Sequence, residues 1–163
     1  MTKESKPILV AEILKCDSVL PSGHVYPKDV IEKSIAALND RLKKGEKILG
    51  YMVDNRDRFG DNIFEASHEL KMVEIKDDGA VIGELELYDT PKGKIVQDML
   101  NECDFADNNR KSSLKPVVSG FGEIGPNNKV TTFNIMGVDV EICDHEPEPW
   151  GPKIISYDPK NNN

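Results

Sequence analysis

Two neighbouring segments of the chain alternate between apolar and polar residues, and a short turn joins them. Ala66–Ile75 alternates from its third residue on, and in Ala80–Tyr88 two leucines alternate with two glutamates. A period of two is typical of a strand that buries one face, and Asp77-Asp78-Gly79 between the segments is a hairpin signal. The fold must therefore accommodate an antiparallel pair of strands over 66–75 and 80–88.

Two other segments carry helix signals. Lys28–Lys44 has a proline at its start, apolar residues at spacings of three and four, and a glycine after its end. Proline fits the first turn because its missing N–H has no partner there, and glycine ends helices readily. Lys94–Cys103 has a similar periodicity, and Asp89–Gly93 opens it with Asp89 or Thr90 as the N-cap. We expect the first helix to serve packing and to carry no chemistry.

The remaining apolar segments predict further strands, and the polar segments between them predict loops. The central segment is Leu114–Gly125, which indicates a strand that stops at Ser119 and then turns through its glycines. The other strands are expected at 7–14, 47–53, 129–136 and 138–142, the last two as a hairpin, and the loops at 54–62, 104–113 and 144–151. Together these elements predict one α+β domain over 1–151, built on a strongly bent antiparallel sheet or barrel with two flanking helices. A polar C-terminal tail is expected over 152–163.

Length and charge narrow the classes of function. The 163 residues suit one domain, and no apolar run approaches the roughly 18 residues of a membrane span. The net charge of −8 argues against nucleic acid as a partner, because that binding relies on clustered Lys and Arg. No apolar segment of a signal peptide follows the first residues, so we expect retention in a cytosol. The three cysteines are widely spaced and form no CxxC pair, which argues against a zinc site or a disulfide framework.

Two motifs offer alternatives that their surroundings disfavour. Gly120-Phe-Gly122-Glu-Ile-Gly125 has the spacing of a dinucleotide fingerprint, but that fingerprint needs a helix directly after it, and Pro126-Asn-Asn predicts a turn. Asp144–Glu148 holds three carboxylates and a histidine that could ligate a hard metal ion, but these lie in a proline-containing loop instead of converging from rigid elements. We therefore expect no cofactor and no metal.

Ser119, His68 and Asp54 are the remaining candidates for catalysis. A nucleophilic serine needs a base within hydrogen-bond reach, and the base needs an orienting partner. The residue types are present, but a serine at a strand end is usually a surface hydroxyl, and a histidine that begins a strand is usually half-exposed. Spacing alone therefore does not predict a hydrolase.

Four segments taken together resemble the phage prohead (capsid maturation) serine proteases, a family with a fold like that of the herpesvirus assemblins. Gly23–Ile35 is similar to the family's helix opening around Tyr-Pro, and Ser67-His68-Glu-Leu to a Ser-His-x-Ile that begins a strand. Gly83–Val96 is close to a strand followed by Leu-Asp-Thr-Pro-x-Gly-Lys, and Pro116–Gly122 to Gly-Val-Ser-Ser-Arg-Gly. These segments follow the family's order over roughly residues 8–145, so the resemblance implies the family's fold.

The resemblance also implies roles for the site residues, and there the chain departs from the family's pattern. Ser119 stands at the position of the family's nucleophile, but the serine and arginine that follow it in the family are Gly120 and Phe121. The family's catalytic histidine lies in Gly-Glu-Leu-x-His-Pro. Here the matching segment is Gly50–Asn55, which puts Asp54 in place of the general base. The ordinary pKa of an aspartate is about 3.9, far from the value that suits a base that later acts as an acid.

The resemblance therefore implies a phage head protein that keeps the prohead-protease fold and has lost proteolysis. Such a protein would bind the major capsid protein or a scaffold protein as a decoration, cement or assembly factor, and could form homo-oligomers. It would be found in the host cytoplasm during assembly and then in the virion head. The alternative is an active maturation protease that cleaves capsid or scaffold proteins, with Ser119 as nucleophile, His68 as base and Asp54 orienting the base. A third class, small-ligand binding through the glycines, rests on their spacing alone.

Overall fold

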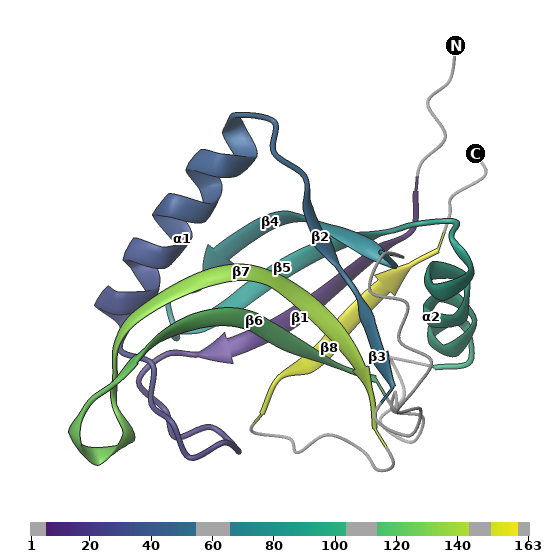
Figure 1. Cartoon of the computed structure of the whole chain (residues 1–163). Helices are drawn as coiled ribbons and strands as arrows, with labels where there is room; N and C mark the ends of the chain where they lie inside the picture. The colour runs from purple at the N-terminus through teal and green to yellow at the C-terminus, as the bar shows by residue number, and fades with distance from the viewer. Residues whose placement is uncertain (1–5, 55–65, 104–113, 144–150, 160–163) are drawn as a thin grey trace.

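The computed structural model describes residues 6–54, 66–103, 114–143 and 151–159, which form one α+β domain (Figure 1). The described strands make two sheets, one of five strands and one of three. The predicted fold class is thereby confirmed, although the strands are divided between two sheets instead of forming one sheet or a barrel. The loops predicted at 54–62, 104–113 and 144–151 lie almost wholly outside the described residues.

The five-stranded sheet has the order β2-β4-β5-β1-β8, and every neighbouring pair in it is antiparallel. The predicted pair of alternating strands is confirmed as the β4–β5 hairpin, whose turn contains Gly79 at a φ of 90°. Glycine adopts this left-handed conformation without the steric penalty of a β-carbon. The strands are β1 (Ile8–Lys15), β2 (Ile48–Gly50), β4 (His68–Ile75), β5 (Ala80–Leu87) and β8 (Lys153–Asp158).

The three-stranded sheet has the order β3-β7-β6. It consists of β3 (Met52–Asp54), β6 (Leu114–Ile124) and β7 (Val130–Ile142). β6 and β7 form a long antiparallel hairpin, whereas β3 runs parallel to β7. Figure 1 shows the two hairpin strands curving together, with the short 3-10 helix η1 (Pro126–Asn128) at their far end.

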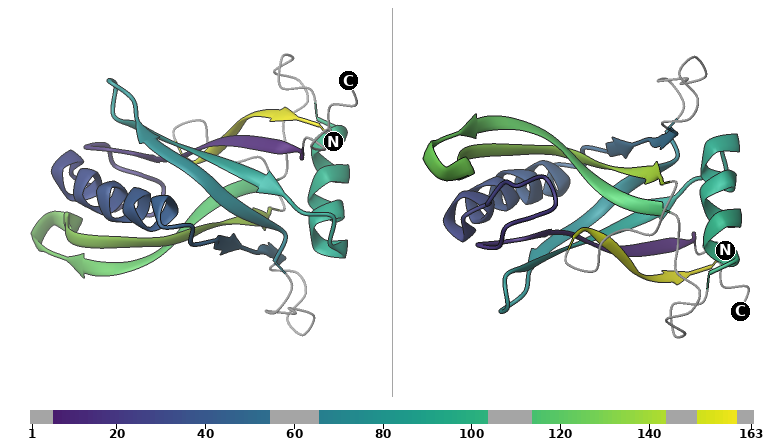
Figure 2. Two further views of the ribbon diagram at one scale, coloured as in Figure 1. Left: turned by 90° about the horizontal axis from the view of Figure 1, so that it is seen from above. Right: turned by 90° about the horizontal axis from the view of Figure 1, so that it is seen from below.

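The two predicted helices are confirmed as α1 (Lys28–Lys43) and α2 (Pro91–Asn101). Seen from above and below, α1 lies between the β4–β5 and β6–β7 hairpins, and α2 crosses the other end of the molecule (Figure 2). α1 buries apolar residues of one face, as its spacing predicts. Of the two candidate caps of α2, Thr90 is the one used, because its hydroxyl accepts a hydrogen bond from the Gly93 N–H.

The core lies between the inner faces of the two sheets. Leu9, Leu70 and Leu85 enter it from the five-stranded sheet, and Leu114 and Val140 enter it from the three-stranded sheet. Full burial of such a side chain contributes roughly 1.5–3 kcal/mol, so these contacts are a main source of the stability of the sheet pair. They also fix the positions of the residues where the two sheets meet.

The chain passes from one sheet to the other within 47–53, which the sequence predicts as a single strand. The first part is β2, paired with β4, and the second part is β3, paired with β7. Tyr51 lies between the two strands. Its N–H donates to Asp139 Oδ1 at 3.0 Å, and its carbonyl accepts from the Val140 N–H at 3.0 Å. We call residues 48–54 the crossover.

The prediction that the central strand stops at Ser119 and turns through the glycines is wrong. β6 continues to its end five residues later, and the chain turns at η1, where Asn127 and Asn128 adopt positive φ angles. Gly120 and Gly122 lie inside the strand because a β-carbon at either position would collide with backbone oxygens of β7. The glycines therefore permit close approach of two strands instead of a turn.

Two further expectations need correction. Residues 129–136 and 138–142 are not a hairpin but one strand, β7, because Gly137 continues the pairing opposite Ser119 without turning the chain. Residues 153–158 of the expected tail form β8, which pairs with β1 and packs Ile154 and Tyr157 against the core.

Candidate functional site

Ser119 lies in β6 beside an irregularity of the β6–β7 hairpin. Ser119 pairs with Gly137, whereas the next residue, Gly120, pairs with Ile135, so Met136 is an extra residue on β7. Such a bulge interrupts regular pairing and turns nearby side chains to new directions. Ser119 is partly exposed, and no hydrogen bond of its hydroxyl to another described residue is found.

His68 begins β4 and is fully buried at 0% exposure, which corrects the expectation of a half-exposed histidine. Its Nε2 lies 2.6 Å from the carbonyl oxygen of Val138, and its Nδ1 lies 2.7 Å from Ser67 Oγ. Because a carbonyl oxygen can only accept, we assign the proton to Nε2, and Nδ1 then accepts from the Ser67 hydroxyl. Both ring nitrogens are thus engaged in the interior.

Gly50 provides the space for this arrangement. It pairs with His68 across β2 and β4, and a β-carbon at Gly50 would collide with both the His68 ring and the carbonyl oxygen of Val138. Because Gly50 has no side chain, the His68 ring can lie against its backbone and reach from the five-stranded sheet to the three-stranded sheet. The contact occurs at the crossover. β3 pairs with β7 only from Val140 to Ile142, so no described strand pairs with Val138 on this side of β7.

Burial also sets the charge of His68. Desolvation lowers the pKa of His68 to about 4, and the hydrogen bond to Val138 opposes this shift without cancelling it. The ring is therefore neutral near pH 7. A neutral imidazole could act as a base, but the nitrogen without a proton already accepts from Ser67, and no described hydrogen bond joins His68 to Ser119.

Asp54 and Ser119 are not brought together. Asp54 ends β3 opposite Ile142, and Ser119 is opposite Gly137 on the other side of β7. Five positions of a strand separate these two partners, which is roughly 17 Å at 3.3–3.4 Å per residue. The structure describes the backbone of Asp54 and not its side chain. The three candidates predicted from sequence therefore occupy three different places around β7.

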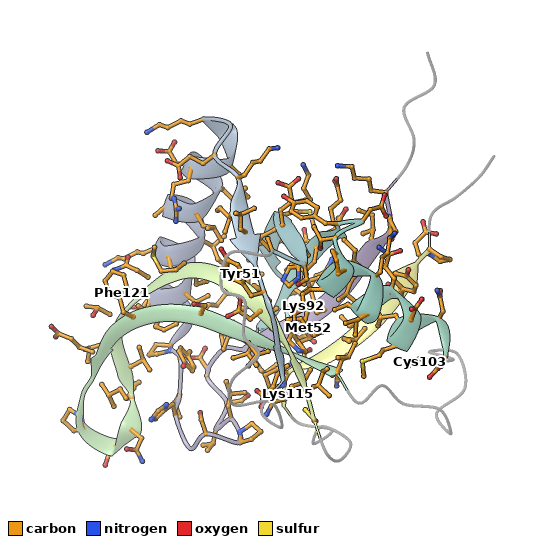
Figure 3. The ribbon with its side chains drawn as sticks, turned by 45° about the vertical axis from the view of Figure 1, so that its right-hand side comes forward. Tyr51, Met52, Lys92, Cys103, Lys115 and Phe121 are labelled. Carbon is orange, nitrogen blue, oxygen red and sulfur yellow. The ribbon has the colours of Figure 1, made fainter. Side chains whose placement is uncertain are left out.

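Asp139 is a candidate that the sequence analysis did not identify. It pairs with Val117, two residues from Ser119 along β6, so Asp139 and Ser119 share one face of the sheet as diagonal neighbours, about 7–8 Å apart. Burial raises the pKa of its carboxyl, and the Tyr51 N–H that it accepts from acts in the opposite direction. Figure 3 labels Tyr51 on the crossover, and Lys115 and Phe121 along β6. The alternating sequence Val-Asp-Val-Glu-Ile of 138–142 gives no local signal for this position.

A cavity of about 220 Å³ lies beside β6. Four consecutive residues of the strand, 115–118, form one side of it, and Leu20 and Tyr26 of the loop before α1 lie on the other side. Lys115 and Glu141 are the charged members of its lining, and they form an ion pair at 3.9 Å. The cavity is otherwise mostly apolar, as a site for a side chain or small apolar group would be.

Neither a metal centre nor a membrane span emerges from the described part of the chain. Over these residues, no group of three or more His, Cys, Asp and Glu side chains is placed to hold a metal ion. None of the helices described is long and apolar enough to cross a membrane. The carboxylates and histidine of 144–148 lie outside the described residues.

Comparison with solved structures identifies a protein of similar fold. The chain superposes on the capsid assembly protease gp21 of bacteriophage T4 with a TM-score of 0.58, at 17% sequence identity. The alignment covers 82% of this chain and 80% of that chain, so the likeness extends over most of each chain and not over one motif. No protein-family model matches the chain. No curated protein matches it either. The chain therefore has the fold of a phage capsid assembly protease, and at this identity the likeness concerns the fold alone.

Proposed function

We propose that this chain is a phage head assembly protein that binds the major capsid protein or a scaffold protein and does not cut either. The observation that carries this proposal is the fold shared with the T4 capsid assembly protease over most of both chains. The T4 protein of this fold is a capsid assembly protease. On this proposal the chain uses the same fold to contact capsid or scaffold proteins and does not cleave them.

The surroundings of the three candidate residues support the absence of proteolysis. Both ring nitrogens of His68 form hydrogen bonds inside the protein. Asp54 pairs with Ile142 of β7, whereas Ser119 pairs with Gly137, five positions away along the same strand. A serine without a positioned base loses several orders of magnitude of rate. On this proposal the protein acts by binding, in the host cytoplasm during assembly and then in the head.

Co-expression with the major capsid and scaffold proteins of the source phage tests the proposal. We expect the full chain to co-sediment with assembled heads and all three proteins to keep their full mass in mass spectrometry. In mature virions the chain should be present, uncleaved, in fixed proportion to the major capsid protein. Cleavage of a capsid or scaffold protein that disappears with Ser119→Ala would overturn the loss of proteolysis.

Proteolysis by Ser119 remains a second candidate because of one observation. Ser119 is partly exposed, and the partly buried carboxyl of Asp139, with its raised pKa, lies diagonally opposite on the same face. A fluorophosphonate probe tests this directly, since it labels activated serines. Labelling that is lost in Ser119→Ala and kept in Ser156→Ala, a change of an exposed serine of β8, would establish an activated Ser119.

A further inference from the structure

No described strand is hydrogen-bonded to the outer edge of β6, although β1 and β8 of the five-stranded sheet approach this strand. In the order β3-β7-β6, β7 is paired on both sides, and β6 is the end of the sheet as far as the described strands extend. Figure 1 shows this edge running along the side of the molecule toward β8. An edge strand presents unpaired N–H and C=O groups, which can pair with a strand of another chain.

The register shows which peptide groups are free. The Val140 N–H donates to Tyr51, on the side of β7 away from β6. Successive residues of a strand present their peptide groups to opposite sides, so Asp139 faces β6 and exchanges hydrogen bonds with its partner Val117. The next residue of β6, Val118, then presents its N–H and C=O to the open edge.

The position of His68 supports this assignment independently. His68 reaches the Val138 carbonyl from the five-stranded sheet, so this carbonyl points away from β6 and from Val118, which is opposite Val138. Among the described residues, none donates to or accepts from the backbone of Val118. Pro116, two residues earlier, is buried and directs its carbonyl to the same side, where no described residue donates to it, and it has no N–H to leave unpaired.

The cavity beside β6 opens on this same edge. Its lining includes residues 115–118 without a gap, although side chains of a strand alternate between its two faces. A cavity that touches four consecutive residues must lie along the edge and not over one face. Apolar groups form most of its walls, among them Ile13, Leu20, Tyr26, Pro116, Val118 and Pro152.

The size and charge of the cavity indicate what fits. Its volume of about 220 Å³ is several times the ~30 Å³ that one water occupies in the liquid, which leaves room for an apolar side chain. The two charged residues of the lining, Lys115 and Glu141, neutralise each other. An uncharged side chain is therefore favoured over an acidic or basic one, because it loses no hydration of a charge on entry.

We infer that β6 is a docking edge for an extended segment of a partner protein. The segment adds a strand to the three-stranded sheet by hydrogen bonds to Pro116 and Val118 and places one apolar side chain in the cavity. This is strand addition, in which the main chain gives affinity and the pocket gives specificity. The inference rests on the proposed function for the identity of the partner, but the docking edge itself is defined by the free peptide groups and the cavity.

Amide hydrogen exchange of the free protein, followed by NMR, is the first test. The Val118 amide should exchange at least 100-fold faster than those of Val117 and Ser119, which face β7. Equal protection of the three amides in dilute protein would overturn the inference, because the edge would already be paired. Protection that grows with protein concentration, with a dimer in sedimentation velocity, would assign the edge to a second copy of the chain and would also overturn it.

Peptide binding to the full chain is the second test. The probes are a positional-scanning library of capped nine-residue peptides and overlapping peptides of the source phage's major capsid and scaffold proteins. We expect binding peptides with one apolar position, protection of the Val118 amide on binding, and loss of binding when alternate peptide nitrogens are methylated. Ser22→Trp, at the exposed rim of the cavity, should weaken binding at least tenfold, whereas Val19→Trp, exposed on the same loop outside the lining, should not change it.

The outcomes separate this inference from the proposed function. Library peptides that bind at β6 while no capsid or scaffold peptide does would keep the docking edge and remove the proposed partner. The intact capsid protein could instead bind without protecting the Val118 amide and with equal affinity for the Ser22→Trp variant. That result would support the proposed partner and overturn the docking edge. Absence of any peptide that protects Val118 would also overturn it.

Discussion

His68 Nε2 lies 2.6 Å from the carbonyl oxygen of Val138, so a side chain of one sheet completes the hydrogen bonding of a strand in the other. The carbonyl is at the crossover, where the chain leaves one sheet for the other, and no backbone N–H of a described residue donates to it. A buried carbonyl without a partner is costly, and the ring removes this cost while packing between the sheets. The position of His68 in the fold therefore gives this histidine a structural role between the two sheets.

Replacing His68 by Phe should destabilise the protein by about 1–3 kcal/mol. Phenylalanine keeps an aromatic ring in the space but leaves the Val138 carbonyl and the Ser67 hydroxyl without their partner, and this is the usual penalty for an unsatisfied buried group. Urea unfolding followed by circular dichroism measures the change. The matched control is His24→Phe in the loop before α1, which should shift the free energy of unfolding by less than about 0.5 kcal/mol. Equal effects of the two changes would contradict the inter-sheet role.

Replacing Gly50 by Ala should destabilise the protein by about 3 kcal/mol, since the new β-carbon collides with the His68 ring and with Val138 backbone. The control is Gly23→Ala, where a β-carbon meets open space and the φ of 86° alone is unfavourable, so a loss of about 1 kcal/mol is expected. Combined with His68→Ala, the Gly50 change should show a coupling of about 1–3 kcal/mol in a double-mutant cycle. Strict additivity would mean that the two residues do not share the space described.

The parts of the fold that the sequence predicted are those that local chemistry decides. The β4–β5 hairpin follows from alternation around Asp77-Asp78-Gly79, and the start of α2 follows from a threonine that can cap it. These signals act over a few residues, so no knowledge of distant partners is needed. The same holds for α1, whose apolar face appears in the sequence as spacings of three and four.

The parts that failed depend on distant residues. Gly120 and Gly122 look like turn residues until the backbone of β7 lies against them, and nothing local distinguishes the two cases. The division of 47–53 into β2 and β3 depends on where Tyr51 meets Asp139 and Val140, nearly 90 residues later. The expected tail was polar at its end, but Ile154 and Tyr157 become core residues once β1 is beside them.

In the candidate site, too, local sequence predicted some features, and others depend on residues far away in the sequence. The place of Ser119 on a strand after an apolar run could be predicted, because that run is local. The burial of His68 could not, since the carbonyl that holds its ring is 70 residues away in the sequence. Asp139 was missed because one acidic residue between valines looks like an ordinary exposed position, and only the crossover makes it partly buried.

Ser34→Ala should destabilise the protein by about 1–3 kcal/mol. The Ser34 hydroxyl of α1 is buried and accepts the Ile135 N–H at 2.9 Å, next to the bulge opposite Ser119, so alanine leaves this N–H without a partner. Thermal and urea unfolding measure the loss, and amide exchange at Ile135 should accelerate more than at Val140. Ser156→Ala on β8 is the matched control and should be nearly neutral. An unchanged exchange rate at Ile135 would show that another group receives this N–H.

Acid should destabilise the protein through His68 in a defined pH window. The pKa of His68 is about 4 in the folded protein and about 6.5 when unfolded, so between these values the unfolded chain binds more protons. Stability from this group is therefore complete above about pH 6.5, falls as the pH drops to about 4, and totals about 3 kcal/mol at 1.36 kcal/mol per unit of pKa. Urea unfolding at pH 7, 6, 5 and 4 for wild type and His68→Phe isolates the group, because shifts at Asp139 and other residues are common to both proteins. The free energy of unfolding of wild type minus that of His68→Phe should fall by about 3 kcal/mol as the pH drops from 7 to 4. An NMR titration should find the His68 ring neutral down to about pH 4. A constant difference between the two proteins, with a ring that titrates near 6.5, would show that His68 is open to solvent.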